Sequence, residues 1–215
     1  SLLTGTYPHE AGIGHMTSPP NDPKGRNYGF PQYQGKLNNN VITIAEALGE
    51  AGYSTSMSGK WHLSFFDKNQ WPLQRGFDNF YGFIAGAGNF FKPEAPRFIF
   101  EGNEKLNIDD ENYYTTDVFT DKAIEYIDKV KSENNEKPFF LYLSYNAPHW
   151  PLQAPKEDID KYRGSYLNGW ENLREERYKR MIEMGLIDSS WDLSYDDIVS
   201  WKSLSEEKRK EMDLR

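Results

Sequence analysis

The residues best suited to chemistry are two potential cations on either side of a tryptophan, Lys60 and His62. In an extended segment side chains alternate, so we expect Lys60 and His62 to face one side while Trp61 and Leu63 anchor the loop in the core. Two cations held in this way suit a tetrahedral oxyanion or the charge that develops on a leaving oxygen. Lysines and histidines in loops are more often simply solvated, so the pattern alone leaves both interpretations open.

A third candidate, His149, lies among prolines directly after an apolar run, in Asn146-Ala-Pro-His-Trp-Pro151. The prolines end any strand there and fix the backbone around the histidine. His149 could act in catalysis or could bond a backbone carbonyl at the strand end. For His9 and His15, in the glycine-rich opening, a structural or solvent-facing role is favoured over the lining of a substrate cleft.

The elements around Lys60 and His62 are readable from local signals. Thr43 and Glu46 form a capping box that predicts a short helix through Glu50. Residues 53–58 then predict a strand that ends at Gly59. This places both cations at the carboxyl end of a strand, where ligands bind in open α/β sheets.

A second helix and strand complete the pattern. Apolar residues at helical spacing predict an amphipathic helix over 117–132, and the apolar run at 138–145 predicts a central strand buried on both faces. Helix, short loop and buried strand indicate an α/β fold. Two charged helices are expected at 170–184 and 205–212, and the first forty residues predict a long, shaped loop.

Composition excludes several classes of function. The 215 residues carry a formal net charge of -8, which argues against nucleic acid as the main partner, and contain no cysteine. No apolar run is long enough to span a membrane. The sequence contains no Walker loop, no Rossmann glycine fingerprint and no zincin helix, and no pair of carboxylates has metal-ligand spacing.

Three ordered segments resemble the sulfatase family, in its arylsulfatase branch, within the alkaline-phosphatase-like superfamily. Residues 1–9 resemble the end of the first family signature, residues 52–62 are close to the second, and residues 138–151 resemble the strand that leads to Pro-His-x-Pro. Further similarity at 71–78, 158–166 and 169–177 extends the resemblance over nearly the whole chain. It implies an α/β fold with a mixed or mostly parallel sheet flanked by helices, incomplete at both ends.

The resemblance also implies a mechanism for sulfate ester hydrolysis. By family analogy Lys60 neutralises sulfate and nucleophile oxygens, and His149 faces the sulfate and the leaving oxygen. His62 would contact the formylglycine and remove its second proton to expel sulfate. Lys60 and His149 would therefore also bind the substrate, an aryl, steroid or sugar sulfate.

Several family features are expected outside residues 1–215, which the resemblance identifies as the central part of a single catalytic domain. The formylglycine, made from a Cys or Ser by a maturation enzyme, would lie a few residues before Ser1. The ligands of a divalent cation, usually Ca²⁺, would lie in other segments as well. We therefore expect the segment alone to be inactive, and the full-length protein to be periplasmic or secreted, with no nucleic-acid or membrane partner.

Two other functions remain open from the sequence. One is a phosphonate or phosphodiester hydrolase of the same superfamily, which the residue five positions before Ser1 would distinguish. The other is a non-catalytic fragment or carbohydrate-binding module whose 14 Tyr and 6 Trp stack on sugars, although the spacing of these aromatics also fits a core.

Overall fold

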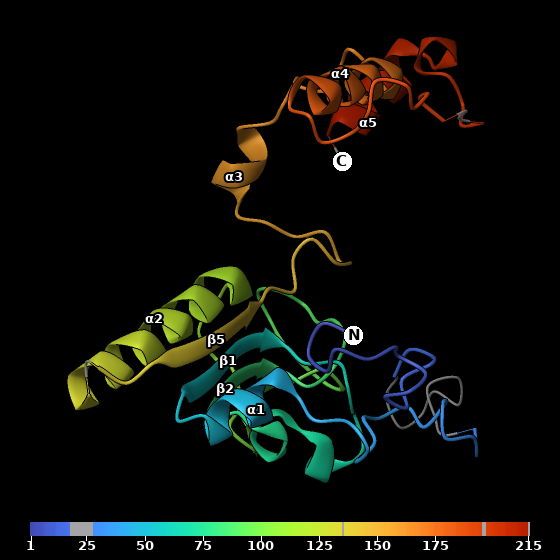
Figure 1. Cartoon of the computed structure of the whole chain (residues 1–215). Helices are drawn as coiled ribbons and strands as arrows, with labels where there is room; N and C mark the ends of the chain where they lie inside the picture. Colours follow the sequence, from blue (N-terminus) through green and yellow to red (C-terminus); the bar gives the residue numbers. More distant parts are fainter. Residues whose placement is uncertain (18–27, 135, 195–196, 215) are drawn as a thin grey trace. The chain divides into compact units, whose positions relative to one another are not determined.

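The computed structural model describes residues 1–17, 28–134, 136–194 and 197–214. Two compact units make up the chain, Ser1–Gln153 and Ala154–Arg215. The first unit contains a five-stranded sheet in the order β4-β3-β2-β1-β5 (Figure 1). Its strands are β1 (Ser54–Lys60), β2 (Asn79–Phe83), β3 (Ile99–Glu101), β4 (Glu104–Lys105) and β5 (Phe139–Ser144).

The sheet is mixed. Strand β1 lies parallel to both β2 and β5, whereas β2 pairs with β3, and β3 with β4, in antiparallel fashion. The predicted α/β fold with a mixed sheet flanked by helices is thus confirmed. No local pattern predicts β2, β3 or β4, because each of these strands is short.

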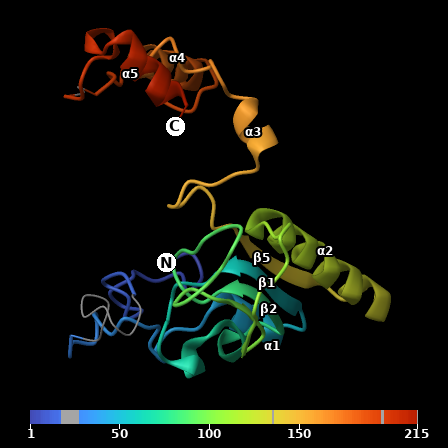
Figure 2. The same cartoon turned by 180° about the vertical axis from the view of Figure 1, so that it is seen from behind.

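Helices α1 (Ile44–Glu50) and α2 (Thr115–Glu133) pack on opposite faces of the sheet (Figures 1 and 2). Because side chains alternate along a strand, each strand contributes to two separate cores. On β5, Phe140 and Tyr142 pack against the cluster that contains Ala45 of α1, whereas Leu141 and Leu143 pack against the cluster on the α2 side. The strand is therefore held from both faces.

Local capping explains where α1 begins. The Thr43 hydroxyl accepts a hydrogen bond from the Glu46 amide at 3.0 Å, and the Glu46 carboxylate accepts one from the Thr43 amide at 2.6 Å. The predicted capping box and helix are confirmed. The same Glu46 pairs with buried Arg75, which ends the second of two short 3₁₀ helices, Lys68–Gln70 and Pro72–Arg75.

Two predictions about strands need correction. Gly59 does not end β1 but lies inside it, with φ +120 and a close approach to β5 that leaves no room for a Cβ, which would lie 1.9 Å from the Ser144 carbonyl oxygen. The predicted strand at 138–145 is confirmed as β5, but it is not central. Among the described strands it pairs only with β1, and its residues are partly exposed.

The remaining predicted elements are present. Helix α2 covers the segment predicted at 117–132. The described part of the first forty residues forms a loop that takes part in two isolated bridges, Ile13 with Tyr33 and Lys36 with Ser64. Residues 18–27 of that loop lie outside the described residues.

The second unit is helical and contains both predicted charged helices. Its elements are α3 (Lys156–Asp160), α4 (Trp170–Glu183), a 3₁₀ turn (Trp201–Ser203) and α5 (Glu206–Asp213). Trp170 and Trp201 pack edge to face with ring centroids 4.9 Å apart, and the Trp201 indole donates to the Leu167 carbonyl at 3.1 Å. In the described part of the chain, no helix has the length and apolarity required to cross a membrane.

Candidate active site

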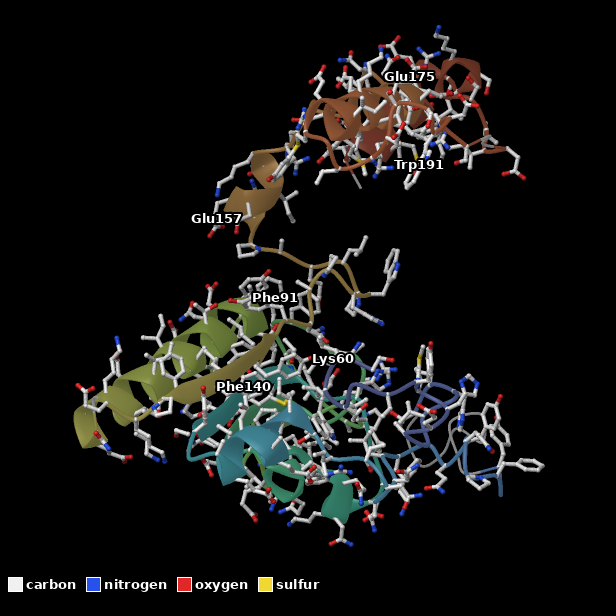
Figure 3. All side chains as sticks on the ribbon, in the orientation of Figure 1. Lys60, Phe91, Phe140, Glu157, Glu175 and Trp191 are labelled. Atoms are coloured by element: carbon white, nitrogen blue, oxygen red, sulfur yellow. The ribbon has the colours of Figure 1, made fainter. Side chains whose placement is uncertain are left out.

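Lys60 is the last residue of β1 and lies at the carboxyl end of the sheet (Figure 3). The pairing register aligns Lys60 with Phe83, the last residue of β2, and Gly59 with Ser144, the last residue of β5. The carboxyl ends of three parallel strands therefore meet in one row. This is the edge at which ligands bind in open α/β sheets, as the sequence predicted for Lys60.

The Lys60 side chain is half-buried and cationic. The backbone carbonyl of Lys60 accepts a hydrogen bond from the Ser144 hydroxyl at 2.8 Å, which fixes the end of β1 to the end of β5. Burial lowers the pKa of the Lys60 ammonium. Within the part of the chain that the structure describes, Lys60 forms no ion pair with a carboxylate, so its charge is available to an anion.

Trp61 anchors the segment in the core, as predicted. Its side chain is 3 % exposed, and its indole donates to the Gln70 carbonyl at 3.0 Å. The alternation predicted for residues 60–63 does not continue, however, because His62 has φ 56 in the left-handed region. Such a conformation is uncommon for histidine and is retained only where surrounding contacts hold it.

The contacts that hold His62 also define its tautomer. Its amide donates to the Ile84 carbonyl at 3.2 Å, and its ring Nε2 lies 2.9 Å from the Thr17 carbonyl oxygen. Since a carbonyl oxygen can only accept, Nε2 carries the hydrogen and the lone pair of the neutral ring is on Nδ1. Gly86 lies directly against this ring, where a Cβ would be 2.3 Å from Cε1.

His149 is held in a similar way, at the exit of β5. Its amide donates to the carbonyl of buried Asn146 at 3.0 Å, and its ring Nδ1 lies 2.7 Å from the Trp150 carbonyl oxygen. The carbonyl bond considered from the sequence is therefore present. It occupies only Nδ1, and no described residue bonds Nε2 of this exposed side chain.

In the structure Lys60 and His149 both act electrostatically on His62, and so does a fourth residue, Arg97. Burial is the main cause that lowers the pKa of His62. The hydrogen bond to Thr17 raises this pKa, whereas the charges of Lys60, His149 and Arg97 lower it further. The sequence could not indicate Arg97, because its position follows from the pairing of a strand, β3, that was not predicted.

The donor chemistry of this cluster does not fit a Ca²⁺ ion, which takes oxygen ligands, because its members are two cationic side chains, Lys60 and Arg97, and two imidazoles. Among the described residues no group of three or more histidines or carboxylates could hold a metal. The cluster fits an anion instead.

A cavity of about 560 Å³ adjoins the cluster, and His62 and Trp61 form part of its wall. His9 and His15 line it as well, but both pack on tyrosines. The His9 ring lies edge to face with Tyr33 at 5.4 Å, and the His15 ring lies 4.8 Å from Tyr28. These contacts support the structural roles favoured from the sequence while placing both histidines at the cavity.

Comparison with known proteins decides the family. The family model described as Sulfatase matches residues 1–202. The chain belongs to the sulfatase family. The resemblance seen in the three ordered segments is thereby confirmed.

The relatives of this sulfatase are longer proteins. The chain is 37% identical over 198 residues to an uncharacterized sulfatase of Schizosaccharomyces pombe, covering 86% of this chain and 35% of the relative. It is 30% identical over 218 residues to an arylsulfatase of Klebsiella aerogenes, which covers 97% of this chain and 45% of that relative. This sulfatase chain therefore spans less than half the length of these curated relatives.

A solved structure shares the fold. The crystal structure of Ps i-CgsB in complex with k-i-k-neocarrahexaose is 30% identical, with a TM-score of 0.60, and covers 74% of this chain and 36% of that one. The alkaline-phosphatase-like α/β fold of the sulfatase family is therefore shown for this chain.

Proposed function

We propose that the full-length protein is a sulfatase that hydrolyses a sulfate monoester, and that Lys60, His62 and His149 act on the sulfate group. The observation that carries the proposal is the convergence of these three residues at the carboxyl end of the sheet, where no carboxylate of the described residues is among the groups that act on His62. Family membership and the arylsulfatase of Klebsiella aerogenes support the reaction type.

Each residue suits a defined role. Lys60 supplies a fixed charge to the sulfate oxygens, in a half-buried position where electrostatic interactions are stronger than in water. Neutral His62 accepts a proton at Nδ1, because Nε2 is bound to Thr17. Protonated His149 donates from its free Nε2 to the leaving alcohol oxygen.

A formylglycine, when present, supplies the hydroxyl that attacks sulfur. We infer that residues 1–215 form the central part of one catalytic domain, and that this nucleophile and the ligands of a Ca²⁺ ion come from other segments of the full-length protein. The share of the relatives that the chain covers supports this arrangement. The family also favours export to the periplasm or the medium and a maturation enzyme as partner. The sugar complex of Ps i-CgsB favours a sugar sulfate as substrate.

The test uses the full-length enzyme, with formylglycine confirmed by mass spectrometry. We expect release of inorganic sulfate from an aryl or sugar sulfate, and no comparable cleavage of phosphodiesters. An enzyme that cleaves phosphodiesters and fails on every sulfate ester would instead be the phosphonate or phosphodiester hydrolase considered above.

A further inference from the structure

The connection between β2 and β3, residues 84–98, begins and ends at the candidate active site. Phe83 at the end of β2 pairs with Lys60 on one side and with Ile99 at the start of β3 on the other. Arg97 lies two positions before Ile99, and His62 lies two positions after Lys60. Both residues therefore extend beyond the same edge of the sheet. Neighbouring strands are about 4.8 Å apart, so β1 and β3 are separated by roughly 10 Å, a gap that an arginine side chain can largely span.

Direct contacts hold this connection against the site residues. Gly86 lies against the His62 ring with no space for a Cβ. The Asn146 side-chain amide donates to the Gly88 carbonyl at 3.4 Å, and the Phe90 amide donates to the Gln153 side chain at 2.9 Å. The connection therefore packs against His62 and against both flanks of the turn that carries His149. Figure 3 places Phe91, from its middle, at the same end of the sheet as Lys60.

Arg97 adds a fixed positive charge to this edge of the sheet. Arg97 is exposed, and it forms no ion pair with any carboxylate of the described residues, although Glu94 lies in the same turn. Its charge adds to those of Lys60 and His149 around His62. A sulfate monoester carries one negative charge, whereas the chain as a whole has a formal net charge of -8. An arginine that acts on His62 and has no carboxylate partner among the described residues therefore fits a second anionic group.

We propose that Arg97 binds a second negatively charged group of the substrate, a carboxylate or a further sulfate on an acidic sugar, and so selects multiply charged esters. The guanidinium offers paired N–H donors that match either oxyanion in a bidentate geometry. The inference rests on the proposed function, since it places the reacting ester at Lys60 and the second anion at Arg97.

The experiment measures kcat and KM for sulfate release by the full-length enzyme with three matched substrates. One is a neutral sugar carrying a single sulfate, the second is the same sugar with a further sulfate, and the third carries a carboxylate instead. The variants are Arg97→Ala, Arg97→Lys and, as control, Lys92→Ala, which removes an exposed cation from the same connection. Lys92 is not among the charges that act on His62.

We expect Arg97→Ala to lower kcat/KM for one or both doubly charged substrates by about 10- to 100-fold, mainly through KM, as typical for loss of a charge-assisted hydrogen bond. Activity on the singly sulfated sugar stays within about 3-fold, and Arg97→Lys restores part of the loss. The two doubly charged substrates show whether the second group is a sulfate or a carboxylate.

Two results overturn the inference while leaving the proposed function intact. These are equal losses on all three substrates, and a loss in Lys92→Ala as large as that in Arg97→Ala. A wild-type enzyme that releases no sulfate from any substrate overturns the proposed function itself and the inference with it.

Discussion

Substitution of Gly86 by alanine tests the placement of His62 most sharply. The added Cβ would lie 2.3 Å from Cε1 and 2.5 Å from Nε2 of the His62 ring. Because carbon atoms pack at about 3.5–4.0 Å, the ring must move by more than about 1 Å. That movement breaks the 2.9 Å bond between Nε2 and the Thr17 carbonyl. Displacement of a reacting group by about 1 Å costs on the order of 10²-fold in rate, so we expect kcat/KM for sulfate release to fall by about that factor.

The assay compares this variant of the full-length enzyme with two others. Gly49→Ala is the matched control, because the new Cβ on α1 would lie 4.0 Å from its nearest neighbour, the Gly76 carbonyl oxygen. This control should keep full activity. In a His62→Ala background the ring is gone, so Gly86→Ala should cause almost no further loss. A Gly86→Ala enzyme with activity within about 2-fold of wild type would show that the position of the His62 ring does not limit the reaction, because a misplacement of this size is expected to cost far more.

Three further predictions concern stability and pH. Arg75→Ala should destabilise the fold by about 3–5 kcal/mol in chemical denaturation, because it leaves the Glu46 carboxylate and buried carbonyl groups without their partner; a loss below about 1 kcal/mol would show that the ion pair is not formed. Thr43→Ala removes the cap of α1 and should cost about 1–2 kcal/mol, measured in the same way, whereas Thr43→Ser should be close to wild type. Burial, followed by the charges of three neighbours, holds the pKa of His62 below 6.5, so the acid limb of kcat/KM should lie below pH 6.5. Removal of the Arg97 charge should move the acid limb to higher pH, and a shift to lower pH in Arg97→Ala would contradict the assignment of this limb to His62.

The lowered pKa of His62 also makes the free energy of unfolding depend on pH. A histidine with a lowered pKa in the folded state binds its proton more readily when the chain unfolds. His62 therefore destabilises the fold as the pH falls from about 6.5 to its folded pKa, and it has no such effect above about pH 6.5.

Local signals in the sequence were sufficient for α1, α2, α4 and α5 but not for the short helix α3. They were also sufficient for β1, which ends at Lys60, and for β5, which ends shortly before His149. The capping box at Thr43 predicted α1 within one residue, and apolar spacing predicted α2. These signals depend on neighbours in the sequence, so one chain is enough to read them. The short strands β2, β3 and β4 depend instead on long-range pairing, which leaves no such local pattern.

The site was predictable as a set of residue types but not as a geometry. The left-handed φ of His62 arises from bonds to Thr17 and Ile84, both distant in sequence, so the expected alternation from Lys60 could not hold. Arg97 reaches the site through the register of β3, which only the folded sheet reveals.

The role of the three residues can be measured as the rate of sulfate release by the full-length enzyme, with formylglycine confirmed by mass spectrometry. We expect wild type to release sulfate, and Lys60→Ala, His62→Ala and His149→Ala each to lower the rate by about 10²- to 10³-fold. Full activity in all three variants would contradict the claim that these residues act on the sulfate.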